Sequence, residues 1–236
     1  MKRQICSILL FIFCVTLQAQ LVAYPEGLKA NMPHNDDYTV RVRIPGGEWE
    51  DLFEYNVQVD MDAVQNASMV QFDMNGTVEV MVKKNNGTVR EVDIRPLSCN
   101  IQYRQNKNVI TFMLDKPQYL SVEFNGDRLH NLHLFANPLE TEVYKKAEKG
   151  IMYFGPGVHA PLDLPNNLIR VPGNTTVYLA PGAVLKAKLL VDGVENVRIL
   201  GRGILAHPVR GIEVTNVKNV LIHGIKVVNP NHYTVF

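Results

Sequence analysis

The sequence predicts an all-β protein in two parts: an N-terminal antiparallel β-sandwich, then the first coils of a right-handed parallel β-helix. Two observations lead to this prediction. Short valine- and isoleucine-rich strands recur every 20 to 23 residues after Val177, and the first half alternates apolar with polar residues between Asn-Gly turns. A period near 20 residues is typical of a solenoid, and alternation with period two is typical of half-buried strands.

Residues 1–20 have the features of a secretory signal peptide. Lys2 and Arg3 give a basic start, an apolar stretch follows, and Ala19 is a small residue near a suitable cleavage point. The apolar stretch is too short to span a membrane. We therefore expect a secreted or periplasmic protein without a membrane anchor, beginning with an N-terminal extension over residues 21–37.

Composition argues against several kinds of partner. The formal net charge is +1, which does not favour nucleic acid. Two of the three cysteines lie in the signal peptide, so Cys99 alone can form neither an internal disulfide nor a cysteine metal site. His130 and His133 are three residues apart and would point to opposite faces of a strand. We expect no metal and no cofactor.

The sandwich is predicted over residues 38–137. Strict alternation over residues 38–44 and 53–61 is followed by further apolar runs, separated by the pairs Asn75-Gly76, Asn86-Gly87 and Asn125-Gly126. Asn-Gly between apolar runs is a strong hairpin signal, and many short strands at this spacing are typical of a sandwich. Residues 138–150 are polar and are predicted to link the two parts.

The β-helix is predicted over residues 151–236. Its strands open at Val177, Val197 and Val220, and Asn196 and Asn219 occupy the same turn position in successive coils. Asparagine tolerates the left-handed backbone that such turns require. A sandwich with evenly spaced hairpins is the alternative. Since the last apolar run is not followed by a capping segment, we expect a truncated β-helix.

Several segments resemble dextranase-like glycosidases. The resemblance covers residues 38–236, and its motifs are turns that specify architecture more than substrate. The turns of the coils are similar to those of glycoside hydrolase families 49 and 28, which include dextranases, isopullulanases and polygalacturonases. The segments that carry the resemblance are Ser121–Asp127, Leu132–Glu140, Tyr153–His159, Val177–Val184 and Ile199–Leu205.

The resemblance implies a secreted, polysaccharide-degrading glycoside hydrolase that cleaves O-glycosyl bonds of pectin or an α-glucan with inversion. Inversion uses two carboxyl groups about 6.5–9.5 Å apart. These families carry them on later coils. Here Asp192, Glu195 and Glu213 stand singly: Asp192-Gly193 is predicted to be a turn, and Glu195 and Glu213 are predicted to be solvated. We expect no catalytic residue here and no activity from this chain alone. The alternatives are a non-catalytic carbohydrate-binding or structural remnant, and a polysaccharide lyase on the same fold.

His232 and Tyr233 are the predicted substrate-binding residues. They follow the turn Asn229-Pro230-Asn231, where the resemblance implies an aromatic residue lining the groove. After Pro165 there are eight basic and three acidic residues, which favours an anionic polysaccharide through long-range attraction. A charged outer face of the solenoid explains this excess equally well.

Overall fold

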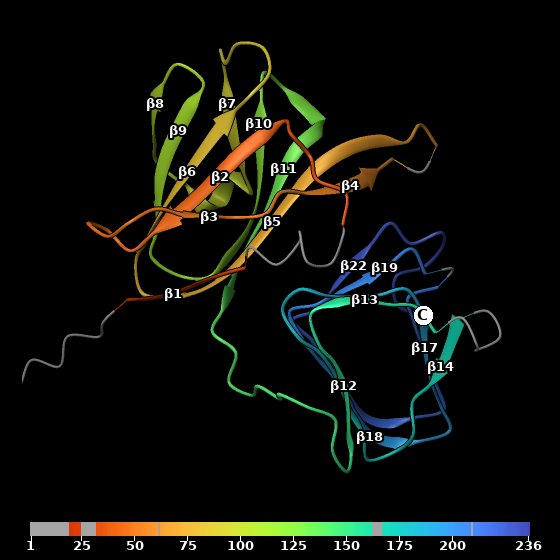
Figure 1. The fold of residues 1–236 in the computed structure, drawn as a ribbon. Coiled ribbons are helices and arrows are strands. Elements are labelled where there is room, and N and C mark those ends of the chain that lie inside the picture. Colours follow the sequence, from red (N-terminus) through yellow and green to blue (C-terminus); the bar gives the residue numbers. More distant parts are fainter. Residues whose placement is uncertain (1–18, 25–31, 61, 162–166, 209) are drawn as a thin grey trace, which may run out of the picture.

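The computed structural model describes residues 19–24, 32–60, 62–161, 167–208 and 210–236. It confirms the predicted all-β class, with a sandwich followed by a parallel β-solenoid of about three turns (Figure 1). Of the predicted signal peptide only Ala19 and Gln20 fall within the described residues. The extension predicted at residues 21–37 contributes a strand, because Leu21 pairs with Met74 at the edge of the sandwich.

Two sheets form the sandwich. The five-stranded sheet runs β3-β2-β6-β9-β8, and the six-stranded sheet runs β1-β5-β11-β10-β7 with β4 also paired to β5. A short 3-10 helix, Leu97–Cys99, follows β7. The strands are β1 (Gln20–Ala23), β2 (Tyr38–Arg43), β3 (Glu50–Asp51), β4 (Tyr55–Val59), β5 (Gln65–Asn75), β6 (Val78–Lys84), β7 (Val92–Arg95), β8 (Tyr103–Asn106), β9 (Val109–Leu114), β10 (Gln118–Phe124) and β11 (Asp127–Pro138).

One strand pair of the sandwich departs from the predicted antiparallel arrangement. β11 pairs with β5 in parallel, and this register sets Asn137 beside Asp73. A parallel pair needs a long connection, and here the chain passes through both sheets between the two strands. This pairing carries two polar side chains to the end of the sheet that faces the solenoid.

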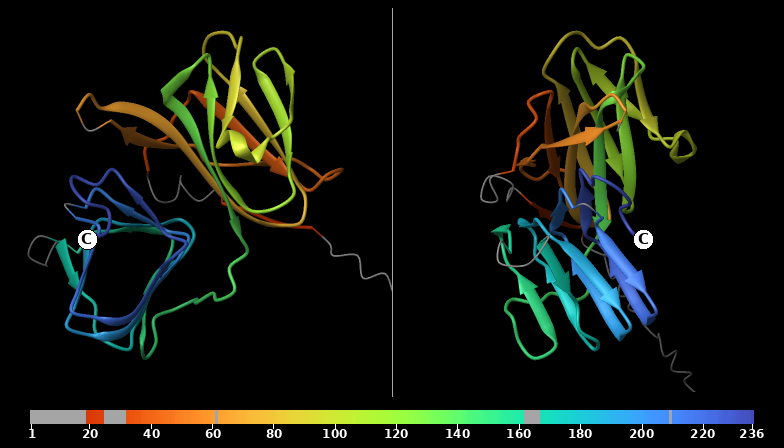
Figure 2. Two further views of the ribbon diagram at one scale, coloured as in Figure 1. Left: turned by 180° about the vertical axis from the view of Figure 1, so that it is seen from behind. Right: turned by 90° about the vertical axis from the view of Figure 1, so that its right-hand side faces the viewer.

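The solenoid coils stack their strands into three parallel sheets, and the last coil contributes to the first two of them (Figure 2). The first sheet contains β12 (Ile151–Phe154), β15 (Thr176–Leu179), β18 (Glu195–Gly201) and β21 (Lys218–His223). The second contains β13 (Gly157–His159), β16 (Ala183–Leu185), β19 (Ile204–Ala206) and β22 (Lys226–Val228). The third contains β14 (Leu168–Arg170), β17 (Lys188–Asp192) and β20 (Ile212–Thr215). Inward-pointing aliphatic side chains such as Leu185, Leu189 and Ile199 fill the interior.

An asparagine ladder fixes the turn between the third and first sheets. Asn174, Asn196 and Asn219 have φ of 56°, 58° and 53°. The Asn196 amide donates to Asn174 Oδ1 at 3.0 Å, and the Asn219 amide donates to Asn196 Oδ1 at 2.8 Å. The predicted equivalence of Asn196 and Asn219 is confirmed, and Asn174 extends the ladder by one coil.

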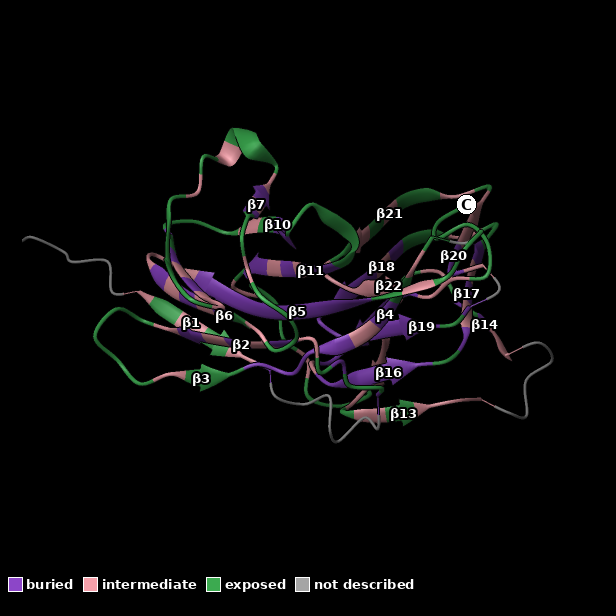
Figure 3. Cartoon of the chain, turned by 90° about the horizontal axis from the view of Figure 1, so that it is seen from above, coloured by how far each residue is buried: buried purple, intermediate pink, exposed green. Residues whose placement is uncertain are grey.

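The second solenoid sheet packs against the sandwich. Its outward side chains Val184, Ile204 and Val228 meet Tyr55 and Met69 of the sandwich in one buried cluster. Figure 3 shows this buried layer along β5, β16 and β19. Burying an aliphatic side chain contributes about 1.5–3 kcal/mol, so the two parts are joined by an apolar contact. Polar side chains, among them Asp73, Arg202 and Lys226, also form contacts between the two parts.

Candidate functional site at the junction

The turn after β18 brings an arginine into the junction between the two parts. Gly201 has φ of 120°, a conformation essentially reserved for glycine. The amides of Arg202 and Gly203 both donate to the Leu179 carbonyl oxygen at 2.9 Å. A Cβ on Gly201 would overlap that oxygen, and a Cβ on Gly224 in the next coil would overlap the Arg202 guanidinium. Glycines therefore make the space that Arg202 occupies.

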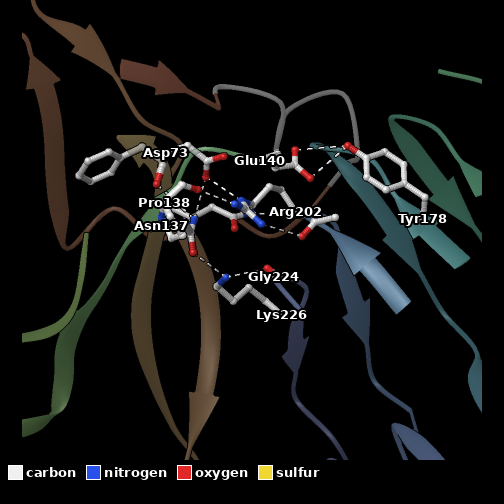
Figure 4. A network of polar contacts seen from close by, with 11 residues as sticks. Asp73, Asn137, Pro138, Glu140, Tyr178, Arg202, Gly224 and Lys226 are labelled. Carbon is white, nitrogen blue, oxygen red and sulfur yellow. Dashed lines mark hydrogen bonds and ion pairs between the residues drawn. The ribbon is translucent and has the colours of Figure 1, made fainter. Parts of the chain in front are cut away.

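Arg202 clamps the solenoid to the sandwich (Figure 4). Its side chain is 2% exposed, as is that of Asp73 on β5, and its Nε donates to Asp73 Oδ1 at 2.7 Å. Nη2 donates to the Pro138 carbonyl oxygen at 2.7 Å, and the Arg202 carbonyl accepts from Gln71 Nε2 at 2.8 Å. A buried charge requires such pairing. The position of Asp73 is itself fixed by an Asn137 hydrogen bond at 3.2 Å.

The segment after β11 crosses the outer face of the first solenoid sheet. Glu140 accepts from the Tyr178 hydroxyl at 3.1 Å, and the ring of Tyr144 meets that of Tyr178 edge to face at 5.4 Å. Burial raises the pKa of Glu140, with Arg202 opposing that rise. Burial, with Glu140 nearby, also raises the pKa of Tyr178. This segment, predicted as a linker, is thus attached to the coils by specific contacts.

A cleft of about 320 Å³ lies between this segment and the coils. Glu142 on one wall forms an ion pair with Arg198 on the other, and the Arg198 hydrogen bonds lower the pKa of Glu142 to about 2. Leu221 on the floor is 45% exposed. The lining residues are Pro138, Leu139, Glu140, Thr141, Glu142, Arg198, Leu200, Gly201, Arg202, Leu221 and His223. Apolar floor and charged walls suit a polar ligand with apolar faces, such as a sugar chain.

Lys226 on β22 completes the polar network. Its Nζ donates to Asn137 Oδ1 at 3.2 Å and to the Gly224 carbonyl oxygen at 2.9 Å. Burial, reinforced by the nearby positive charge of Arg202 and opposed by Asp73, lowers the pKa of Lys226 from 10.5 to about 8. Both acceptors are neutral, so this ammonium sits at a cost to stability.

Because the pKa of Lys226 is lowered in the folded protein, we expect the stability of the protein to depend on pH. Between pH 8 and 10.5 the unfolded chain binds the Lys226 proton more tightly than the folded chain, so the free energy of unfolding rises with pH through this window. The variant Lys226→Met lacks the titrating group and therefore lacks this pH-dependent contribution to stability. We expect the stability of the wild type relative to this variant to rise by at most about 1.4 kcal/mol per pH unit from pH 8 to 10. Urea unfolding at several pH values measures this, and a pH-independent difference would contradict it.

The three acidic residues of the later coils are all engaged. Asp192 accepts from Thr215 Oγ1 at 2.7 Å, and Glu195 lies 3.7 Å from Lys218 Nζ. Glu213 was expected to be solvated, and this expectation is wrong: its side chain is 19% exposed and forms ion pairs with Lys188 and Arg210.

Glu213 and Asp192 face outward from neighbouring strands, because β20 pairs with β17 so that Glu213 lies opposite Leu190. The hydrogen bond from Lys188 lowers the pKa of Glu213. A general acid needs a raised pKa, so Glu213 is unsuited to protonate a leaving group.

The predicted sugar-contacting residues lie away from the cleft. His232 and Tyr233 are both exposed, and their rings meet edge to face at 4.4 Å. The ring of Tyr233 also stacks on that of Phe236, with the ring centroids 5.7 Å apart. The Ile212 amide donates to the Thr234 carbonyl oxygen at 3.0 Å, which places this segment beside β20. Contact of His232 and Tyr233 with sugar stays a prediction.

Among the described residues we searched for metal-binding clusters and for membrane-spanning helices and found neither. No group of three histidine, cysteine or carboxylate side chains in the described ranges could hold a metal ion. His130 instead forms a 2.9 Å contact with Asp127. In the same ranges, no helix has the length and apolar character needed to cross a bilayer.

Asp73, Glu140 and Lys226 were not predicted from the sequence as site residues. The turn Gly201-Arg202-Gly203 lies within Ile199–Leu205, one of the segments that carry the resemblance, but no partner was predicted for its arginine. The available signal was the pair of glycines flanking a basic residue inside an otherwise apolar repeat. Two of the eight basic residues after Pro165 thus face the sandwich: Arg202, which is buried, and Lys226, which is half-buried.

The fold of this chain is similar to that of a known structure. The chain matches Dex49A from Penicillium minioluteum, a dextranase, with a TM-score of 0.65 and 17% sequence identity. The match covers 84% of this chain and 55% of the other, so the chain spans about half the length of that structure. No protein-family model matches the chain, and no curated protein is similar to it. The likeness shows a glycosidase-like fold.

Proposed function

We propose that this chain binds a polysaccharide, pectin or an α-glucan, as part of a secreted or periplasmic glycoside hydrolase that cleaves O-glycosyl bonds with inversion. The observation that carries the proposal is the junction cleft, built where sandwich and solenoid meet in a fold like that of Dex49A. Its exposed Leu221 offers an apolar surface, and Arg198, Glu142 and His223 offer groups that hydrogen-bond to sugar hydroxyls. Secretion is inferred from residues 1–20.

The cleft supports binding better than it supports bond cleavage. Asp73 is buried and held by Arg202, and Glu142 is held in its charged form by Arg198. Burial raises the pKa of Glu140, but hydrolysis with inversion requires a second, free carboxylate to activate water. We assign the role of this general base to none of the described carboxylates at the junction or on the coils. A non-catalytic carbohydrate-binding role is therefore the second candidate.

Affinity electrophoresis tests this proposal. We expect the purified protein to be retarded in gels containing polygalacturonate, dextran or pullulan, and to release no reducing sugar from any of them. Leu221→Ala combined with His223→Ala removes two exposed contacts of the cleft and should weaken binding about tenfold. Met113→Ala, on the far sheet of the sandwich and 46% exposed, is the matched control.

Two results would contradict the proposal. If none of the three polysaccharides retards the protein, the chain does not bind polysaccharide as proposed. If the cleft variant and the wild type are retarded equally, the cleft is not the binding site. Release of reducing sugar would instead overturn the expectation that this chain alone is inactive.

A further inference from the structure

Two aromatic rings of the sandwich lie beside Lys226, the first residue of β22. Tyr119 on β10 and Phe135 on β11 are paired in the sheet register and meet edge to face at 5.3 Å. Phe135 packs partly into the buried contact with the solenoid, whereas Tyr119 is 55% exposed. A large aromatic side chain left this exposed next to a buried contact presents its ring as a flat apolar surface.

The ammonium group of Lys226 lies over these rings. Lys226 Nζ is 4.9 Å from the centroid of Phe135 and 5.8 Å from that of Tyr119. Its hydrogen bonds go to neutral oxygens of Asn137 and Gly224. Within the described part of the chain it forms no ion pair, because the neighbouring carboxylate of Asp73 is taken by Arg202. A partly buried cation in this position is stabilised by an incoming anion.

We propose that Tyr119, Phe135 and Lys226 form a subsite for an acidic sugar, a uronic acid residue of a polysaccharide. The C–H face of the sugar ring packs on Tyr119, whose π face is negative and attracts weakly positive hydrogens. The sugar carboxylate accepts a charge-assisted hydrogen bond from Lys226. A neutral glucan supplies no charge for Lys226, so this subsite selects the pectic class over the α-glucan class. The inference rests on the proposed polysaccharide binding.

Calorimetric titration with two oligosaccharides tests the subsite. The probes are a trigalacturonate and the neutral isomaltotriose, used with the whole protein. We expect the wild type to prefer trigalacturonate. Lys226→Gln, which keeps hydrogen bonding but removes the charge, should weaken that binding about tenfold to a hundredfold. Tyr119→Ala should weaken it about tenfold. Tyr103→Ala, on the other sheet and 39% exposed, is the matched control and should leave binding unchanged.

The outcomes separate this inference from the proposed function. Tyr119 is exposed, so its variant folds even if Lys226→Gln proves unstable, and thermal unfolding of each variant checks this. Equal affinity for the two probes, or trigalacturonate binding untouched by both variants, would overturn the acidic subsite while leaving polysaccharide binding in place. If neither probe binds and the polysaccharide gels show no retardation, both fail together.

Discussion

Gly201→Ala is expected to destabilise the protein by at least about 4 kcal/mol, or to prevent folding. Two effects add. The φ of 120° is strained for alanine, which costs about 1–3 kcal/mol. The new Cβ also overlaps the Leu179 carbonyl oxygen, which already accepts two hydrogen bonds from the next turn. Urea unfolding monitored by circular dichroism measures the loss.

Gly157→Ala separates these two effects. Gly157 has nearly the same φ, 121°, but nothing lies within 4 Å of the Cβ that alanine would add. It should therefore show the backbone strain alone, about 1–3 kcal/mol. If the two substitutions destabilise the protein equally, the close stacking of coils at Leu179 is not what requires glycine at position 201.

Arg202→Met is expected to cost about 3–5 kcal/mol, because it leaves the Asp73 carboxylate buried without its cation. Both side chains are 2% exposed, so water cannot replace the guanidinium. Combining it with Asp73→Leu should recover a large part of the loss, since exchanging both members of a buried pair for apolar residues removes the uncompensated charge. The unfolding free energies of the wild type, the two single variants and the double variant give the interaction energy between Arg202 and Asp73.

Arg198→Met is the matched control for the clamp. Arg198 also pairs with a carboxylate, that of Glu142 across the cleft, but the two side chains are 35% and 44% exposed. Exposed pairs of this kind contribute about 0–1 kcal/mol. A loss for Arg202→Met no greater than for Arg198→Met would show that the Asp73 contact does not hold sandwich and solenoid together.

Local patterns made the fold predictable. Alternation identified the strands of the sandwich because one face of each is buried, as for Tyr38, Val40 and Val42. The repeat identified the solenoid because each coil presents the same inward aliphatic residues and the same turn asparagine, as at Asn196 and Asn219. The parallel pairing of β5 and β11 was missed, because no short turn marks it.

The junction could not be predicted in this way. Arg202 and Asp73 are 129 residues apart in the chain, and no periodicity links such positions. Arginine and lysine are also mostly exposed in proteins, so the basic residues of the coils gave no reason to expect burial. The direction in which the second solenoid sheet faces the sandwich decides which of them are covered, and that is a property of the packed structure.

The most direct test of polysaccharide binding at the junction is a methyl NMR titration with oligosaccharides of galacturonate and of α-glucan. Leu139, Leu200 and Leu221 line the cleft, whereas Met113 lies on the far sheet of the sandwich. We predict that the leucine methyl signals shift with added oligosaccharide and saturate together, while the Met113 signal stays in place. Unchanged leucine signals with both sugars, or shifts confined to Met113 and its neighbours, would contradict it.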